Sequence, residues 1–147
     1  MCGPIFKETP MTLADPAVQR FLDTKEVVVL ATLQPDGAPL AMPMWFLHDP
    51  ESITMISVDG LQKVKNLRRD PRMCMVAETA DAKGIRGVTI QGRAEFLPDG
   101  PERRGLADRF LTKYHPRLEK LWASRTIPPT RVMFKITPSK LTPWGLP

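Results

Sequence analysis

The chain has 147 residues, of which 42% are hydrophobic and 25% are charged, a composition that is ordinary for one soluble globular domain. No apolar run approaches the ~18–20 residues of a membrane span and no signal peptide is recognisable, so we expect a cytoplasmic protein that does not use a membrane. The net charge of +5 favours acidic partners such as phosphates and carboxylates, and the two cysteines, which lack metal-binding spacing, are expected to stay reduced.

The first part of the chain predicts a helix followed by a β-hairpin. Residues 1–11 are expected to form a loose arm. A helix over residues 16–24 follows, because Asp15-Pro16 is a typical helix start and the apolar residues after it recur at i, i+3 and i+4. Residues 27–33 are apolar and rich in β-branched side chains, which predicts a buried strand. A Pro-Asp-Gly turn then leads into a second strand, predicted over residues 38–47.

Two prolines, Pro39 and Pro43, lie within this second predicted strand. Because proline cannot donate a hydrogen bond to a sheet ladder, we expect the Pro43 region to be an edge, a bulge or a place where something other than a strand lies alongside. In a later strand, predicted over residues 85–97, Gly92 and Ala94 leave room for a close backbone approach or a bound ring.

A strand, a glycine loop and a basic helix follow one another in the middle of the chain. The strand is predicted over residues 52–58 and the loop at Asp59-Gly60, and Asp70-Pro71 ends the helix because proline disfavours the α conformation of the residue before it. The helix carries Lys63, Lys65, Arg68 and Arg69. Free N–H groups and the positive end of the dipole at a helix start bind phosphate, so this segment is a candidate phosphate site. A solvated basic helix face is the alternative.

The rest of the chain predicts further strands over residues 72–79 and 130–138. A stripe of apolar residues at helical spacing runs through residues 100–122 and breaks near His115-Pro116, which predicts two helices. Together, six strands in short antiparallel connections with peripheral helices predict a mainly β protein. We expect a six-stranded antiparallel barrel, closed or split, that forms a single domain over residues 1–147.

The sequence offers no familiar pattern of catalytic side chains. Neither His48 nor His115 is next to a serine or cysteine in an elbow motif, and both are expected to be surface turn residues. No H-x-x-x-H or paired C-x-x-C spacing suggests a metal, and the carboxylates are scattered through turns and caps. An enzyme built on this chain would therefore take its chemistry from a cofactor.

Three segments of the chain resemble a known family. ATLQPDGAPLAMPMWF, ITMISV and K-x-K-N-L-R-R-D-P-R are similar in order and spacing to the pyridoxamine 5'-phosphate oxidase-like flavin-binding split β-barrel family. The match runs from about Val27 to Phe96 and, more weakly, through the last strand to Trp144. The N-L-R-R-D-P run looks most like the branch that uses the deazaflavin coenzyme F-420. The resemblance implies a homodimer with two cofactor sites at its interface, the ring lying along the second strand and the phosphate by the loop after the third.

The resemblance also assigns roles to particular residues. Lys63 matches the family's phosphate-binding lysine and Ser57 the hydroxyl residue at the end of the third strand, while Thr32 lies at the edge of the ring. The candidate cofactor-binding residues are Thr32, Met42, Pro43, Met44, Trp45, Ser57, Lys63, Lys65, Asn66, Arg68 and Arg69. No catalytic residue is assigned, because the cofactor carries the hydride.

One departure from the family pattern bears on the cofactor. The oxidases proper tend to have Ser-Arg-Lys where this chain has Leu61-Gln62-Lys63, which removes a hydroxyl and a guanidinium from the phosphate clamp. This argues against tight FMN binding and against true pyridoxamine-phosphate oxidase activity. F-420 ends in a phosphodiester-linked lactate and a polyglutamate tail, and Lys65, Arg68, Arg69 and Arg72 are suited to receive that tail through their long-range field.

We therefore expect an oxidoreductase that binds F-420 and transfers a hydride from its reduced form to a small organic acceptor. An FMN-binding oxidoreductase of the same fold is the first alternative, and a non-catalytic carrier of a flavin or another planar ligand is the second. A nucleic-acid-binding barrel is disfavoured, because the strands lack the regularly spaced surface aromatic residues of a base-stacking platform.

Overall fold

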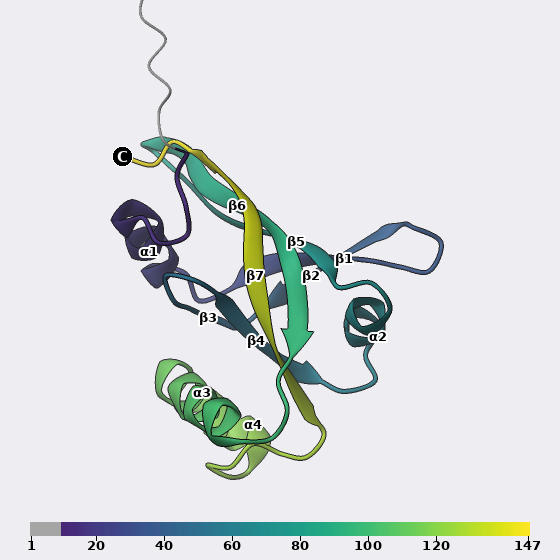
Figure 1. Ribbon diagram of the computed structural model, residues 1–147. Coiled ribbons are helices and arrows are strands. Elements are labelled where there is room, and N and C mark those ends of the chain that lie inside the picture. The colour runs from purple at the N-terminus through teal and green to yellow at the C-terminus, as the bar shows by residue number, and fades with distance from the viewer. Residues whose placement is uncertain (1–9) are drawn as a thin grey trace, which may run out of the picture.

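The computed structural model describes residues 10–147. The loose arm predicted for residues 1–11 lies outside the described residues except for its last two positions. The described chain forms one antiparallel sheet of seven strands with four helices around it (Figure 1). The strands are β1 Val28–Leu33, β2 Pro39–Met44, β3 Phe46–His48, β4 Ile53–Val58, β5 Arg72–Asp81, β6 Gly84–Phe96 and β7 Arg131–Trp144. The helices are α1 Pro16–Asp23, α2 Gln62–Arg69, α3 Pro101–Lys113 and α4 Arg117–Trp122.

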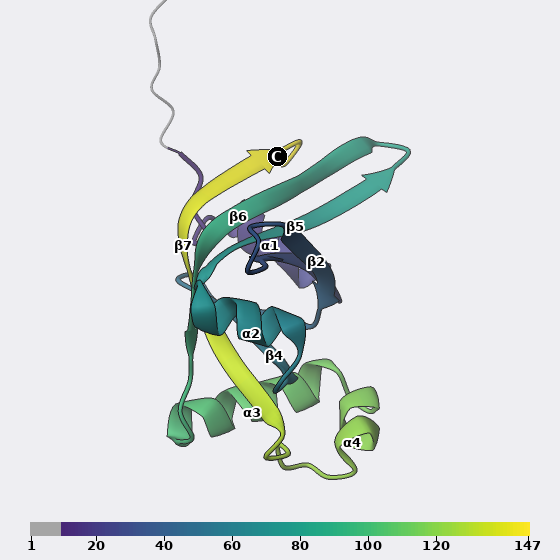
Figure 2. The same cartoon turned by 90° about the vertical axis from the view of Figure 1, so that its right-hand side faces the viewer.

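The strand order of the sheet is β2-β1-β5-β6-β7-β4-β3, so two strands that are consecutive in the chain lie at its opposite ends. The chain passes directly from β2 to β3 and thereby holds the two ends of the sheet together, without a ladder between them. The result is a split β-barrel, as the sequence predicts. Helices α3 and α4 lie together at one end of it, and α2 lies beside β1 (Figure 2).

The prediction of a single strand over residues 38–47 is wrong, and this accounts for seven strands instead of six. The segment is divided at Trp45: β2 pairs with β1, whereas β3 pairs with β4. β1 begins at Val28, opposite Met44, so it offers no partner beyond that point. The predicted edge at Pro43 is confirmed, because β2 has a neighbour on one side only.

The other elements follow the sequence closely, and the main difference is the length of β7. Helices α3 and α4 are separate and flank His115-Pro116, as predicted. β7 is longer than the predicted 130–138 and reaches Trp144, because a bulge opposite Gln91 and Gly92 lets the ladder with β6 continue past Pro138. None of the helices in residues 10–147 combines the length and the apolar character that crossing a membrane requires.

Gly92 is required by a close backbone approach. A Cβ atom built on it would lie 2.3 Å from the carbonyl oxygen of Thr137 on β7, at the bulge. The close approach of backbone, one of the two uses that the sequence suggests for this glycine, is therefore confirmed.

His48 is not a surface turn residue, contrary to the expectation from sequence. Its side chain is 12% exposed and its Nε2 lies 2.7 Å from a carboxylate oxygen of Asp23. The other ring nitrogen, Nδ1, lies 2.7 Å from Oε1 of Gln19, whose amide nitrogen donates to the carbonyl of Asp49. These contacts fasten α1 to the end of β3.

Tyr114, which follows α3, connects the two sides of the split. Its hydroxyl donates to the carbonyl of Glu26, just before β1, at 2.8 Å, and accepts from the N–H of Phe46, the first residue of β3, at 2.9 Å. The ring is buried and stacks on Trp45 with centroids 4.4 Å apart. Burial raises the pKa of Tyr114 to about 12, so the hydroxyl keeps its proton.

Replacing Tyr114 with phenylalanine leaves the buried N–H of Phe46 without its acceptor. We expect Tyr114→Phe to lower the free energy of unfolding by about 1–3 kcal/mol, the usual cost of an unsatisfied buried polar group. Urea denaturation followed by circular dichroism measures the loss. Thr112→Val is the matched control, because it removes an exposed hydroxyl from α3, and we expect it to cost about 0.5 kcal/mol or less. Equal losses in the two variants would contradict the role given to Tyr114.

Candidate functional site

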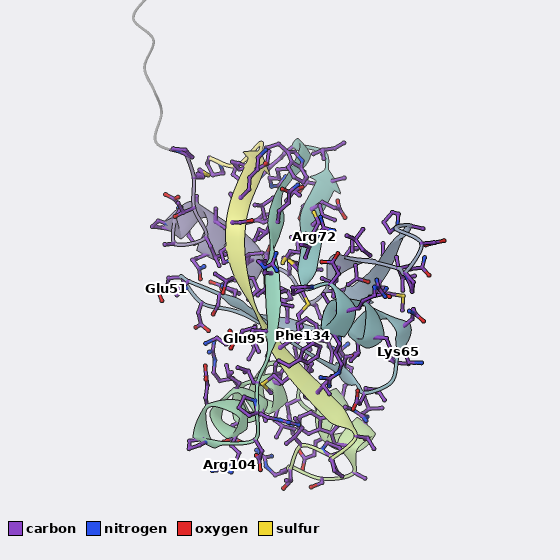
Figure 3. The ribbon with its side chains drawn as sticks, turned by 45° about the vertical axis from the view of Figure 1, so that its right-hand side comes forward. Glu51, Lys65, Arg72, Glu95, Arg104 and Phe134 are labelled. Carbon is purple, nitrogen blue, oxygen red and sulfur yellow. The ribbon has the colours of Figure 1, made fainter. Side chains whose placement is uncertain are left out.

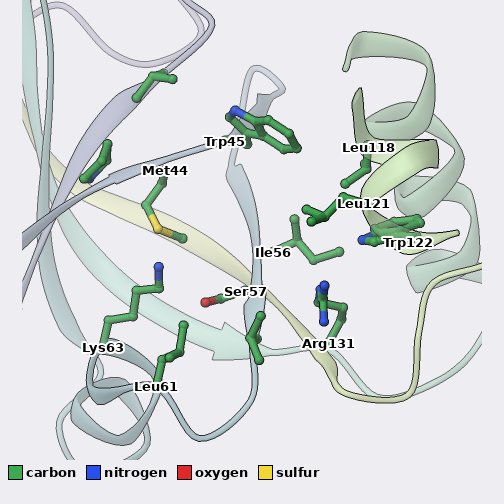
Figure 4. Close-up of a pocket in the computed structure, with 13 residues that line it drawn as sticks. Met44, Trp45, Ile56, Ser57, Leu61, Lys63, Leu118, Leu121, Trp122 and Arg131 are labelled. Atoms are coloured by element: carbon green, nitrogen blue, oxygen red, sulfur yellow. The ribbon is translucent and has the colours of Figure 1, made fainter. Parts of the chain in front are cut away.

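A cavity of about 390 Å³ opens at the place where the barrel is split. The end of β2, the last residues of β4, the start of α2, the helix α4 and the first residue of β7 form its walls (Figure 4). The local sequence explains its lower rim: Gly60, with φ at +86°, turns the chain sharply between β4 and α2. The strand, glycine loop and basic helix predicted from sequence are therefore present, and they border a cavity.

One end of the cavity is polar and cationic. Figure 4 shows the ammonium group of Lys63 pointing into the cavity between Met44 and Ser57. The hydroxyl oxygen of Ser57 is buried and has no hydrogen-bond partner within residues 10–147. Leu61, at the start of α2, provides no side-chain acceptor for the first N–H groups of the helix. An unpaired hydroxyl, an ammonium group and an uncapped helix start thus lie together, and a phosphate has the size and charge to satisfy all of them.

The charge of Lys63 is partly desolvated and has no carboxylate partner among the described residues. Its side chain is half-buried, and burial lowers the pKa of the ammonium group. No carboxylate of residues 10–147 forms a salt bridge with it. An anion that enters the cavity would therefore meet an uncompensated positive charge in a partly desolvated position.

The rest of the cavity is mainly apolar. Pro43, Met44 and Trp45 form one side of it, as the resemblance implies for the residues that flank a ring. Trp45 is held in place from two directions, by the stacked ring of Tyr114 and by the guanidinium of Arg117, 5.7 Å from the centre of its ring. A flat aromatic ligand would find a rigid surface on this side.

Six of the predicted site residues do not line this cavity: Thr32, Met42, Lys65, Asn66, Arg68 and Arg69. Met42 lies on the exposed edge strand β2. Thr32 and Asn66 are both fully buried and bonded to each other, with the amide nitrogen of Asn66 donating to the Thr32 hydroxyl at 3.0 Å. The oxygen of Asn66 accepts from Gln62 at 2.8 Å. This pair attaches α2 to β1 and so sets the position from which Lys63 reaches the cavity.

The remaining predicted cations lie on the outer face of α2. Lys65 is exposed and extends away from the barrel (Figure 3). Arg68 lies 3.7 Å from a carboxylate oxygen of Asp59 and 4.2 Å from the ring centre of Phe96. Arg69 donates to the carbonyl of Leu33. Of the predicted tail-binding residues on α2, Lys65 is thus the least committed to other contacts.

Arg72, the fourth predicted cation, is paired locally. Its guanidinium lies 2.7 Å from a carboxylate oxygen of Asp70, and this contact lowers the pKa of Asp70 to about 2. Both residues are near the surface, where such a pair adds little stability.

The sequence did not single out two components of the cavity. The first is Arg131, which begins β7 and is paired with Val58 of β4. The second is α4, whose Leu118, Leu121 and Trp122 were assigned to the core stripe of a helix but form a wall of the cavity. The pairing of β4 with β7 is the signal for Arg131, and it becomes visible only when the strand order is known.

Comparisons with known proteins place this geometry in a family. Residues 14–145 match the sequence pattern of the family described as pyridoxamine 5'-phosphate oxidase. A reductase of 5a,11a-dehydrotetracycline and 5a,11a-dehydrooxytetracycline from Streptomyces rimosus is 31% identical over 101 residues, which cover 63% of this chain and 71% of the relative. A biliverdin reductase of Mycobacterium tuberculosis that depends on reduced F-420 is 28% identical over 108 residues, covering 72% of this chain and 75% of the relative.

A solved structure agrees with this placement. A conserved hypothetical protein of Mycobacterium tuberculosis superposes with a TM-score of 0.72 at 27% identity, over 96% of this chain and 92% of that one. The sequence match and the structural match thus both extend over nearly the whole described chain. The protein belongs to the pyridoxamine 5'-phosphate oxidase family.

Proposed function

We propose that the protein is an oxidoreductase that binds coenzyme F-420 in the cavity at the barrel split and passes a hydride to a small organic acceptor. The observation that carries the proposal is the polar end of the cavity, where the ammonium group of Lys63 adjoins the buried, unpaired hydroxyl of Ser57. These two groups and the first N–H groups of α2 would hold the cofactor phosphate. The apolar side formed by Pro43, Met44 and Trp45 would take the ring.

The division of work between cofactor and protein follows from the residues present. Bound F-420 in its reduced form supplies the hydride. The protein orients the ring against the fixed surface of Trp45, covers it with the apolar walls, and holds the phosphate through Lys63. No general acid or base of the protein is invoked, and the proton that completes the reduction comes from water.

Two observations favour F-420 over FMN, the second candidate. Leu61 and Gln62 stand where the oxidases proper tend to have a hydroxyl and a guanidinium, so the phosphate clamp is smaller than theirs. The exposed Lys65 and the partly engaged Arg68 lie on the outer face of the same helix as Lys63, where their long-range field would attract an anionic tail. The F-420 dependence of the biliverdin reductase relative supports the same choice.

We further propose that the protein acts as a homodimer. β2 has a strand neighbour on one side only, and apolar side chains remain uncovered there: Met42 is 37% exposed and Val29, on the neighbouring strand, 38%. A second copy that covers this edge would remove the apolar surface from water and close the ring side of the cavity. Sedimentation equilibrium at micromolar concentration tests this, and a monomer there would contradict it.

The phosphate assignment is tested by removing the ammonium group. Lys63→Ala should weaken binding of F-420 by about 1.5–3 kcal/mol, the range for hydrogen bonds to charged groups, with little change in the stability of the fold. Fluorescence titration measures the first quantity and thermal unfolding the second. Lys65→Ala, an exposed lysine on the same helix, is the control and should cost less. Unchanged F-420 affinity in Lys63→Ala would remove the basis of the proposal.

The choice of cofactor is tested by reversing charge beyond the phosphate. Lys65→Glu combined with Arg68→Glu should weaken F-420 binding clearly more than FMN binding, because only F-420 carries the long anionic tail. Arg69 is left intact, since it donates to the Leu33 carbonyl. The difference should shrink with salt, as the Debye length falls from about 8 Å at physiological ionic strength to about 3 Å at 1 M.

A matched control for this variant reverses the same number of charges elsewhere. Lys83→Glu combined with Lys140→Glu changes exposed lysines of the β-hairpin and β7, away from α2, and should affect both cofactors equally. Equal losses of F-420 and FMN in the α2 variant would assign these cations to the solvated helix face and favour FMN.

A further inference from the structure

The cavity holds a second cation, Arg131, at the end opposite Lys63. Lys63 reaches it from α2, whereas Arg131 reaches it from the start of β7 (Figure 4). Figure 4 shows the nitrogen atoms of Arg131 turned towards Ile56 and Trp122, with Ser57 between the two cations. The proposed cofactor uses Lys63 for its phosphate, and its anionic tail is assigned to the outer face of α2, so neither assignment uses the charge of Arg131.

The surroundings of Arg131 fix its backbone but do not neutralise its charge. The backbone carbonyl of Arg131 accepts a hydrogen bond from Arg103 at 2.7 Å, and in the ladder between β4 and β7 Arg131 is paired with Val58. The guanidinium donates to the hydroxyl of Thr130 at 3.0 Å, and it forms no salt bridge within residues 10–147. By contrast, Arg117 on α4 is paired with Glu26. Arg131 is therefore a half-buried guanidinium, aimed into a cavity, whose charge the described chain does not compensate.

The wall beside Arg131 is aromatic and aliphatic. Trp45, Ile56, Leu118, Leu121 and Trp122 form it. Leu121 is 63% exposed although it lies at the cavity, whereas Trp122 is 6% exposed and rigidly placed. An uncovered leucine next to two indole rings provides a surface that a flat apolar molecule would cover.

We propose that this half of the cavity binds the hydride acceptor, and that the acceptor is a flat conjugated molecule carrying a carboxylate that pairs with Arg131. This rests on the proposed function, since it needs a hydride donor at the Met44 side of the same cavity. The conjugated body lies against the α4 wall and the carboxylate faces the guanidinium. Reduction then adds the hydride of reduced F-420 to one carbon of the conjugated system and a proton from water to its partner atom, and F-420 is left oxidised.

A carboxylate fits Arg131 better than a phosphate does. The planar guanidinium donates two parallel hydrogen bonds to the two oxygens of a carboxylate. A phosphate carries up to two charges and usually collects several donors, as the opposite end of the cavity offers with Lys63, Ser57 and the start of α2. A single guanidinium on an apolar wall is therefore suited to an apolar ligand that carries one carboxylate.

The test uses a pair of probes that differ in charge alone. Naphthalene-2-carboxylate and naphthalene-2-carboxamide are both flat, and neither is a hydride acceptor, so binding is measured without turnover. Isothermal titration calorimetry of the full chain, with and without F-420, should show the carboxylate binding about tenfold more tightly than the amide. Arg131→Gln should abolish this preference, and Arg131→Lys should keep part of it.

Two further variants test the other parts of the cavity. One removes the charge at the Lys63 end, and the other removes apolar contact from the α4 wall. Lys63→Gln should keep the preference for the carboxylate. Leu121→Ser, at an exposed position, should weaken both probes by a similar factor of about two to five, since it removes apolar contact. Thermal unfolding of each variant confirms that the fold is kept.

The inference is overturned if Arg131→Gln retains the preference, if Lys63→Gln alone removes it, or if neither probe binds the parent protein. These outcomes are distinct from failure of the proposed function. If neither F-420 nor FMN binds, the proposed function fails whatever the probes do. If a cofactor binds and the probe preference does not follow Arg131, the acceptor assignment alone fails.

Discussion

The hydroxyl of Tyr114 satisfies two backbone groups that the split of the barrel would otherwise leave unpaired. It joins the carbonyl before β1 to the first N–H of β3, at the point where the chain leaves one end of the sheet and enters the other. A sheet closed by a ladder would need no such device. Here a single buried phenol provides the connection, and its ring fixes Trp45 at the same time. The split of the barrel and the shape of the cavity therefore depend on one side chain from the helical end of the molecule.

The cavity exists because three separate segments meet at this split. β4 and the glycine loop bring Ser57 and the start of α2, the break at Trp45 opens the space above them, and α4 covers one flank. The buried hydrogen bond between Thr32 and Asn66 holds α2 against β1 and thereby fixes the direction of Lys63. Thr32 and Asn66 support the site without lining the cavity. The cofactor-like motif on α2 therefore contains a residue that lines the cavity, Lys63, and a residue that holds the helix in place, Asn66.

The sequence predicts local features of this protein better than its long-range pairings. The strand, glycine loop and cationic helix around Lys63 were predictable, because proline, glycine and apolar spacing act within a few residues. The division of residues 38–47 was not, since the segment remains apolar throughout and only its partner changes. Arg131 was missed for a related reason: it lies at the cavity because β7 pairs with β4, where it is opposite Val58, and no local pattern encodes that pairing. The close approach at Gly92 was predictable as one of two uses, and the ladder with β7 shows which backbone comes close.

The placement of α4 has a consequence for how proteins of this shape diversify. Its six residues lie in the connection between α3 and β7, and their side chains contribute a flank of the cavity without any ladder hydrogen bond. Leu118 and Trp122 are buried in the same cluster as Tyr114, whereas Leu121 is exposed. Substitution at Leu121 would therefore leave the sheet, the glycine loop and the cationic end of the cavity as they are, because exposed positions in connecting segments tolerate change. On the proposed function, the fold separates the part that would hold the coenzyme from the part that would face the acceptor, so the acceptor side can change while the coenzyme side stays the same.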